Sequence, residues 1–245
     1  KRQVKNLKVS VLETGKLPEN LEKKFGNYPK MFSDLFDDLN VSYEMKSFDL
    51  INNEFPKNMA NTDLWLITGS SFGVYEKIGW IDKLKNLVQK IYNMKTPLIG
   101  ICFGHQIIAD ALGGKVEKSH KGWGVGVHKY ERKVNPEWSE TVGDFFSGYV
   151  SHQDQVIVKP ENAYTIYGSD FCPNSILCYN DIENPVAISI QSHPEFKKEC
   201  LEMIIQRRIG QTIPSNVGNK GLESLQENID NQKIFEPLLR ALRVI

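Results

Sequence analysis

One cysteine follows a short apolar run and is flanked by glycines, in the sequence Gly100-Ile101-Cys102-Phe103-Gly104. Helix-forming residues come directly after it. Small flanking residues allow a sharp turn from a strand into a helix, and such a turn exposes the central side chain above a sheet. The positive N-terminal end of the following helix favours the thiolate form. The pattern therefore predicts that Cys102 is a nucleophile; the alternative is a buried cysteine that only packs.

A histidine and a carboxylate stand at the end of a second apolar run, far along the chain from Cys102. Residues Val186–Ile190 alternate as in a strand and lead into His193-Pro194-Glu195, where the proline ends the regular structure. A thiol nucleophile needs a base to take its proton and a third group to orient that base. His193 and Glu195 fit these two roles, and the alternative is an ordinary surface turn.

The two motifs together resemble the class I glutamine amidotransferases, and most of all the stand-alone proteins related to the amidotransferase domain of GMP synthetase. The resemblance covers most of the chain and rests on Gly100–Gln106 and Ser192–Phe196. It implies a flavodoxin-like fold and cleavage of a γ-glutamyl amide through a γ-glutamyl thioester. Four shorter segments support it: residues 25–32, 66–71, 122–126 and 151–154.

Attack on a carboxamide creates an oxyanion, which needs preorganised backbone donors. We expect the amides of Ser70 and Phe103 to form this oxyanion hole. Ser70 stands where the family commonly has the second glycine of a Gly-Gly loop. The resemblance further implies four substrate-binding residues: Gly69, Gln106, Ser151 and His152.

The remaining histidines do not indicate a metal site. His105 follows the cysteine motif and is expected to pack locally. His120, His128 and His152 lack the helical spacing or the cysteine partner that is typical of metal ligands. The glycine-rich segment 122–126 lacks the lysine and hydroxyl of a phosphate-binding loop. We therefore predict neither a metal nor another cofactor.

Composition is typical of one globular domain. The chain has 245 residues, of which 40% are hydrophobic, so it can bury one sizeable core. Lys plus Arg and Asp plus Glu number 30 each, which gives no reason to expect nucleic acid or an anionic membrane as a partner. Four cysteines without a recognisable signal peptide favour reduced thiols and a cytoplasmic location. No apolar run is long enough to span a bilayer.

Strands and helices alternate in the first half, which predicts an open, mostly parallel sheet with helices on both faces. After Gly113-Gly114 the segments become shorter and more polar, which predicts an antiparallel extension. We expect one domain over residues 1–245, with a C-terminal helical extension from about residue 211. Helices are expected over 198–208 and 223–243, joined by a mobile connector over 211–221. The expected strands are 7–12, 63–68, 98–102, 124–133, 163–167, 175–179 and 186–190.

Three functions remain open. The resemblance favours a glutamine amidotransferase that hydrolyses glutamine, a small-molecule substrate, and passes ammonia to a separate synthetase subunit. The same residues would serve a γ-glutamyl peptidase, which acts on another leaving group without a partner. In a regulatory binding protein turnover would be lost, but the intact set of Cys102, His193 and Glu195 favours catalysis.

Overall fold

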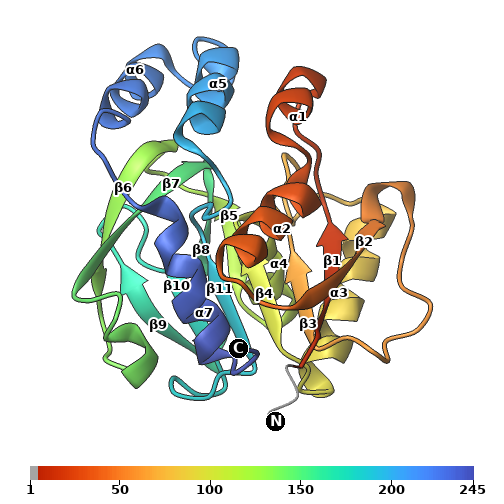
Figure 1. Ribbon diagram of the computed structural model, residues 1–245. Helices are drawn as coiled ribbons and strands as arrows, with labels where there is room; N and C mark the ends of the chain where they lie inside the picture. The colour runs from red at the N-terminus through yellow and green to blue at the C-terminus, as the bar shows by residue number, and fades with distance from the viewer. Residues whose placement is uncertain (1–4) are drawn as a thin grey trace.

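The computed structural model describes residues 5–245 and contains a nine-stranded sheet between two layers of helices (Figure 1). A separate two-stranded sheet pairs β5 (Lys115–Lys118) with β8 (Asp154–Val158). The strands of the large sheet are β1 (Leu7–Glu13), β2 (Tyr43–Asp49), β3 (Leu64–Ile67), β4 (Leu98–Ile101), β6 (Gly124–Arg132), β7 (Phe145–His152), β9 (Ala163–Gly168), β10 (Ile176–Tyr179) and β11 (Ala187–Ile190).

The strand order in the large sheet is β2-β1-β3-β4-β11-β10-β9-β6-β7. From β2 to β11 all neighbours pair in parallel, and from β11 to β7 all pair antiparallel. The predicted sheet with an antiparallel extension is therefore confirmed. The last strand in the chain, β11, joins the two halves and lies beside β4, with Ile190 opposite Ile101.

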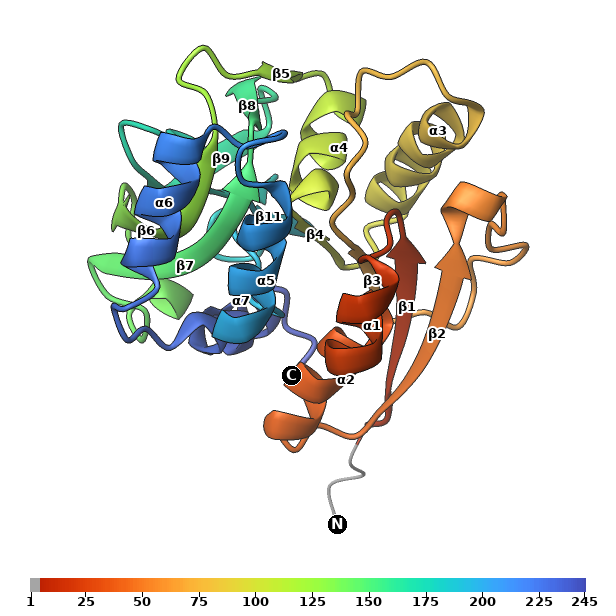
Figure 2. The same ribbon diagram turned by 90° about the horizontal axis from the view of Figure 1, so that it is seen from above.

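Helices cover both faces of this sheet. Figure 2 shows α3 (Gly79–Asn93) and α4 (Phe103–Ala111) on one face, and the remaining long helices on the other. No helix within residues 5–245 combines the length and apolar character needed to cross a membrane. The other helices are α1 (Glu19–Phe25), α2 (Tyr28–Asp38), α5 (Lys198–Arg208), α6 (Ser215–Ser224) and α7 (Phe235–Ala241), with short 3₁₀ turns η1 (Leu50–Asn52), η2 (Glu137–Ser139) and η3 (Asn231–Ile234).

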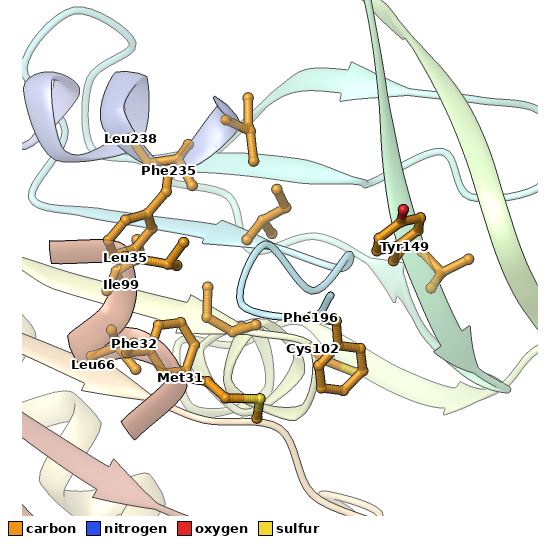
Figure 3. Close-up of a cluster of buried hydrophobic side chains, with 14 of the residues drawn as sticks. Met31, Phe32, Leu35, Leu66, Ile99, Cys102, Tyr149, Phe196, Phe235 and Leu238 are labelled. Atoms are coloured by element: carbon orange, nitrogen blue, oxygen red, sulfur yellow. The ribbon is translucent and has the colours of Figure 1, made fainter. Parts of the chain in front are cut away.

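Two apolar cores hold the layers together. On one face, Phe32 and Leu35 of α2 lie with Phe235 and Leu238 of α7 (Figure 3). On the other face, α3 and α4 bury a second cluster around Trp65 of β3. Each Å² of apolar surface that is removed from water stabilises the fold by roughly 25 cal/mol. Packing on both faces of the sheet thus fixes the carboxyl ends of β4 and β11, where the two chemical motifs lie.

The C-terminal region differs from the expectation. Residues 223–243 do not form one helix, because α6 ends at Ser224 and a new helical segment begins only at η3. Pro237 lies in the first turn of α7, where its missing N–H costs no hydrogen bond. The expected mobile connector over 211–221 contains most of α6, whose Gly221 packs directly on Val125 of β6. Gly218 and Gly221 allow α6 to pack closely on its neighbours. Composition alone does not distinguish a glycine-rich packed helix from a glycine-rich loop.

Candidate active site

Cys102 lies between β4 and α4 with φ 54° and ψ −103°, a backbone conformation that residues other than glycine rarely adopt. Its amide donates to the Ile190 carbonyl at 2.9 Å, which ties the turn to β11. A Cβ atom at Gly100 would lie 2.5 Å from the Gly104 carbonyl oxygen, and one at Gly104 would overlap the Ile67 carbonyl. This tight turn therefore requires glycine at both positions.

His193 follows β11, the neighbour of the strand that leads to Cys102. Its backbone N–H donates to the Tyr149 carbonyl at 2.8 Å, and its ring stacks on Phe196 with centroids 4.1 Å apart. Nδ1 lies 3.0 Å from Oε2 of Glu195, which is buried behind the imidazole. The carboxyl ends of two adjacent parallel strands thus bring together the thiol, the imidazole and the carboxylate.

The charge of His193 is set by its neighbours. Burial alone would lower its pKa, but the charges of Glu195 and Cys102, and side-chain hydrogen bonds with both, outweigh burial and raise the pKa to about 10. These interactions favour the cationic imidazole. A cationic imidazole can give a proton to a departing group.

Gly69 lies against the imidazole. A Cβ atom at this position would come within 2.8 Å of Cε1 of His193. The Gly69 carbonyl accepts hydrogen bonds from Oγ1 of Thr14 at 3.1 Å and from Oγ1 of Thr68 at 3.2 Å. Gly69 thus leaves room for the His193 ring, and its carbonyl accepts from two hydroxyls.

The two expected oxyanion donors belong to Ser70, in the walls of the cavities at Cys102, and to Phe103, the residue after it. Ser70 lines the same cavities as the thiol, and its φ is not among the positive values that would strain a serine. Phe103 begins α4, where first-turn amides have no acceptor within the helix. Apart from bonds within helices and strands, the Ser70 and Phe103 amides donate to no main-chain oxygen of residues 5–245. Both amides are therefore available to donate hydrogen bonds to an oxyanion.

Two cavities meet at Cys102. The larger is a cleft of about 640 Å³, and the smaller has about 50 Å³ and includes His193 in its wall. Ser70, Cys102 and Ser151 line both, whereas Gln106 and His152 line only the cleft. Glu195 lines neither, which suits a group that acts through His193. A third hollow of about 390 Å³ between β7 and α7 includes none of these residues.

Gln106 is already engaged within the protein. Its Nε2 donates to the Asp154 carbonyl at 3.0 Å and to Oε1 of Gln191 at 3.1 Å. Both amide protons are thereby used. The expected contact of Gln106 with a substrate could then involve only its carboxamide oxygen.

Ser151 and His152 carry unused hydrogen-bonding capacity at the cleft. Oγ of Ser151 and Nε2 of His152 are buried without a hydrogen-bond partner among the described residues. Such atoms are uncommon in folded proteins and call for a ligand or water. Burial lowers the pKa of His152 to about 3, so its ring is neutral near pH 7. The side chains of Ser151 and His152 can therefore contribute to binding here.

Three residues near the site were not identified from the sequence. Nε2 of Gln191 lies 3.5 Å from Sγ of Cys102. Tyr28 lines the smaller cavity, and burial together with the charges of Glu195 and Cys102 raises the pKa of its hydroxyl well above the usual value. Asn231 contacts the turn at His193 from a distant segment. The motif around His193 contained the signal for Gln191, and Tyr28 lies in one of the supporting segments, but nothing in the sequence indicated Asn231.

The other histidines pack within the fold. Nδ1 of His105 lies 2.6 Å from Oγ of Ser189, and burial lowers the pKa of His105 to about 4. His128 packs edge-on against Phe171, and burial lowers its pKa to about 4 as well. Within residues 5–245, no three His, Cys, Asp or Glu side chains are placed to share a metal ion.

Comparison with known proteins places these features in a family. Residues 26–207 match the family model of the glutamine amidotransferase class-I proteins. Gamma-glutamyl peptidase 4 of Arabidopsis thaliana is 30% identical, over 91% of this chain and 89% of the relative. A glutamine-hydrolyzing GMP synthase subunit from Methanosphaera stadtmanae is 33% identical over 47% of this chain and 60% of its own length.

A solved structure shows the same fold. The crystal structure of a glutamine amidotransferase from Thermotoga maritima superimposes with a TM-score of 0.74 at 21% identity, over 97% of this chain and 96% of that one. The family match covers most of the chain and includes both motifs. The chain therefore belongs to the class I glutamine amidotransferase family.

Proposed function

We propose that this chain hydrolyses γ-glutamyl amide bonds with Cys102 as nucleophile, His193 as acid and base, and Glu195 as the group that orients His193. One observation carries the proposal. Cys102, in a strained turn, lies at the carboxyl end of the strand next to the one that leads to His193, and Nδ1 of His193 is 3.0 Å from Oε2 of Glu195. Cys102 lines a cleft. This is the arrangement that nucleophilic acyl transfer requires.

In the first step, Sγ of Cys102 forms a bond to the γ-carbonyl carbon of the substrate. The carbonyl electrons move to oxygen, and the amides of Ser70 and Phe103 stabilise that oxyanion. When the oxyanion collapses, the carbon–nitrogen bond breaks and the leaving nitrogen takes a proton from His193. The products of this step are a free amine or ammonia and a γ-glutamyl thioester on Cys102.

In the second step, water replaces the leaving group. His193, now neutral, takes a proton from the water while its oxygen attacks the thioester carbon. The carbon–sulfur bond breaks, glutamate leaves, and the thiolate and imidazolium are restored. Glu195 keeps the imidazole in one orientation and stabilises its positive charge throughout.

γ-Glutamyl peptides are the first candidate substrate class. The relatives named gamma-glutamyl peptidases match nearly the whole chain, whereas the GMP synthase relative matches about half of it. Glutamine hydrolysis with transfer of ammonia to a separate synthetase is the second candidate, supported by that shorter match.

The test is glutamate release by the purified chain from glutamine and from γ-glutamyl peptides. The proposal expects turnover of at least one of them and its loss in Cys102→Ala. The matched control is Cys178→Ala, which removes a buried thiol of β10 that lines neither active-site cavity. Hydrolysis that survives Cys102→Ala would overturn the proposal. Acceleration of glutamine hydrolysis by an added synthetase would favour the second candidate.

A further inference from the structure

Two arginines beside the reactive thiol have no ionic partner. Arg207 and Arg208 end α5. Within residues 5–245 the arginines that pair with carboxylates are Arg132 and Arg240. Arg207 is exposed to solvent, whereas Arg208 is half-buried, and a half-buried guanidinium charge without a counter-ion is unfavourable. An anion that is absent from the protein itself would complete this site.

The position of Arg208 relates it to both cavities. Arg208 lines the 640 Å³ cleft and the small cavity, and Arg207 lines only the small one. The carbonyl of Arg208 accepts hydrogen bonds from the amides of Gln211 and Ile213, each at 3.1 Å. Its backbone is therefore fixed, and its guanidinium extends from a defined point on the wall.

The proposed mechanism indicates which part of the substrate each cavity faces. His193 must protonate the leaving nitrogen, so the leaving group departs on the side of the small cavity, whose wall contains His193. Arg208 is shared between that cavity and the cleft, and so lies where the leaving group passes. Ammonia carries no negative charge that a guanidinium at this position could bind.

The rest of the cleft provides for the γ-glutamyl end. Glu76 and Asp154 suit an α-ammonium group, and Lys118 suits an α-carboxylate. Asp154 is held by the Tyr75 hydroxyl at 3.0 Å, and Glu76 accepts from the Gly73 amide at 2.6 Å. With both charges of the γ-glutamyl end provided for, Arg208 remains for a second carboxylate.

We propose that Arg208, with Arg207 beside it, binds a carboxylate on the leaving group, and that the substrates are γ-glutamyl peptides with a free C-terminal carboxylate. This inference rests on the proposed function. A planar guanidinium can bind a carboxylate through two parallel hydrogen bonds. A cavity of about 50 Å³ cannot enclose a peptide, so the leaving group would extend past Arg208 into the cleft of about 640 Å³, which Arg208 also lines. Clefts that enclose whole small molecules measure roughly 300–1,000 Å³.

The test compares γ-glutamylalanine and γ-glutamyl-alanyl-glycine, each as the free acid and as the C-terminal amide. The measured quantity is the ratio of kcat/KM for the acid to that for the amide. We expect roughly a 10- to 100-fold preference for the acid at one peptide length, as for a hydrogen bond to a charged group. Arg208→Gln should bring this ratio close to one, and Arg208→Lys should retain part of it.

The matched control is Lys198→Gln, which removes one positive charge from the exposed start of the same helix. It should keep the preference if direct binding by Arg208 selects the acid, and should lower it if the positive charge of the helix as a whole does so. Equal rates for acid and amide at both lengths in the unmodified protein would overturn the inference. So would an Arg208→Gln variant that slows both forms in the same proportion, since Arg208 would then serve the γ-glutamyl end or the fold.

Binding separates this inference from the proposed function. In Cys102→Ala protein, calorimetry should show tighter binding of the acid than of the amide, and Arg208→Gln in that background should remove the difference. If the intact chain turns over no γ-glutamyl compound, the proposed function fails and calorimetry still decides on Arg208. Equal binding of acid and amide would overturn the inference whatever the turnover.

Discussion

Asn231 holds His193 in place from outside the motif that contains it. Nδ2 of Asn231 donates to the His193 carbonyl at 2.7 Å and to the Phe196 carbonyl at 2.9 Å, and its Oδ1 accepts from the Tyr149 amide at 2.8 Å. The side chain is buried. One amide group therefore joins both ends of the turn that carries His193 and Glu195 to strand β7.

Replacing Asn231 by aspartate should disturb the orientation of His193. A carboxylate cannot donate to either carbonyl, so two buried acceptors lose their partner at a cost of about 1–3 kcal/mol each. We expect kcat/KM to fall roughly 10- to 100-fold, with a shifted pH profile. The profile matters because a purely structural loss would lower activity without moving its pH dependence. Asp230→Asn, at the exposed neighbouring position, is the matched control and should keep both.

Selective alkylation should identify the nucleophile. Burial raises the pKa of Cys172 and of Cys200 to about 12, and raises the pKa of Cys178 well above the usual value for a thiol. These thiols are also less exposed than Cys102, at 0–1% against 6%. Iodoacetamide at neutral pH should therefore modify Cys102 first, as mass spectrometry of the native protein would show. Equal labelling of all four would contradict the proposed site.

The roles of His193 and Glu195 should differ in size. His193→Ala removes the proton transfer and should lower kcat by about 10³-fold or more. Glu195→Gln keeps the shape of the side chain but loses its charge, so the loss should be smaller. Glu195→Gln should also lower the pKa of His193, because the carboxylate is the strongest influence that raises it. NMR titration of the imidazole measures that shift, and an unchanged pKa would count against the role of Glu195.

Gly69→Ala should impair catalysis through His193. The added methyl would lie 2.8 Å from Cε1 of the imidazole, so the ring must move. We expect a fall in kcat of at least roughly 10-fold, because small displacements of a catalytic group are costly. Gly79→Ala is the control, since no atom lies within 4 Å of its added Cβ. Equal activity of the two variants would show that the imidazole tolerates displacement.

Glu13 should make stability depend on pH. Burial raises its pKa from 4.5 to about 7, and the folded state therefore holds a proton that the unfolded state has lost. Stability should fall as pH rises from 4.5 to 7, by an amount on the order of 1–3 kcal/mol. Glu13→Gln removes this dependence, so its advantage in Tm over the unmodified protein should grow across that range. An advantage that is constant with pH would contradict the assignment.

The sequence was informative where local pattern and topology agree. Alternating apolar runs marked most strands, and the two motifs followed β4 and β11, which the sheet places side by side. Edge strand β2 escaped notice because its residues are largely polar and only half-buried. Helix α6 was mistaken for a connector because its glycines serve close packing against β6. Asn231 could not be found, since a contact with a turn many residues away leaves no local pattern.

The pairing of β11 with β4 also governs when this protein can become reactive. Cys102 follows a strand in the first half of the chain, whereas His193 follows β11, which is synthesised after the whole antiparallel extension. Strand pairing across such a wide sequence separation is slow. A nascent chain therefore carries Cys102 before its proposed base exists, and the strand that joins the two halves of the sheet couples the proposed catalysis to completion of the fold.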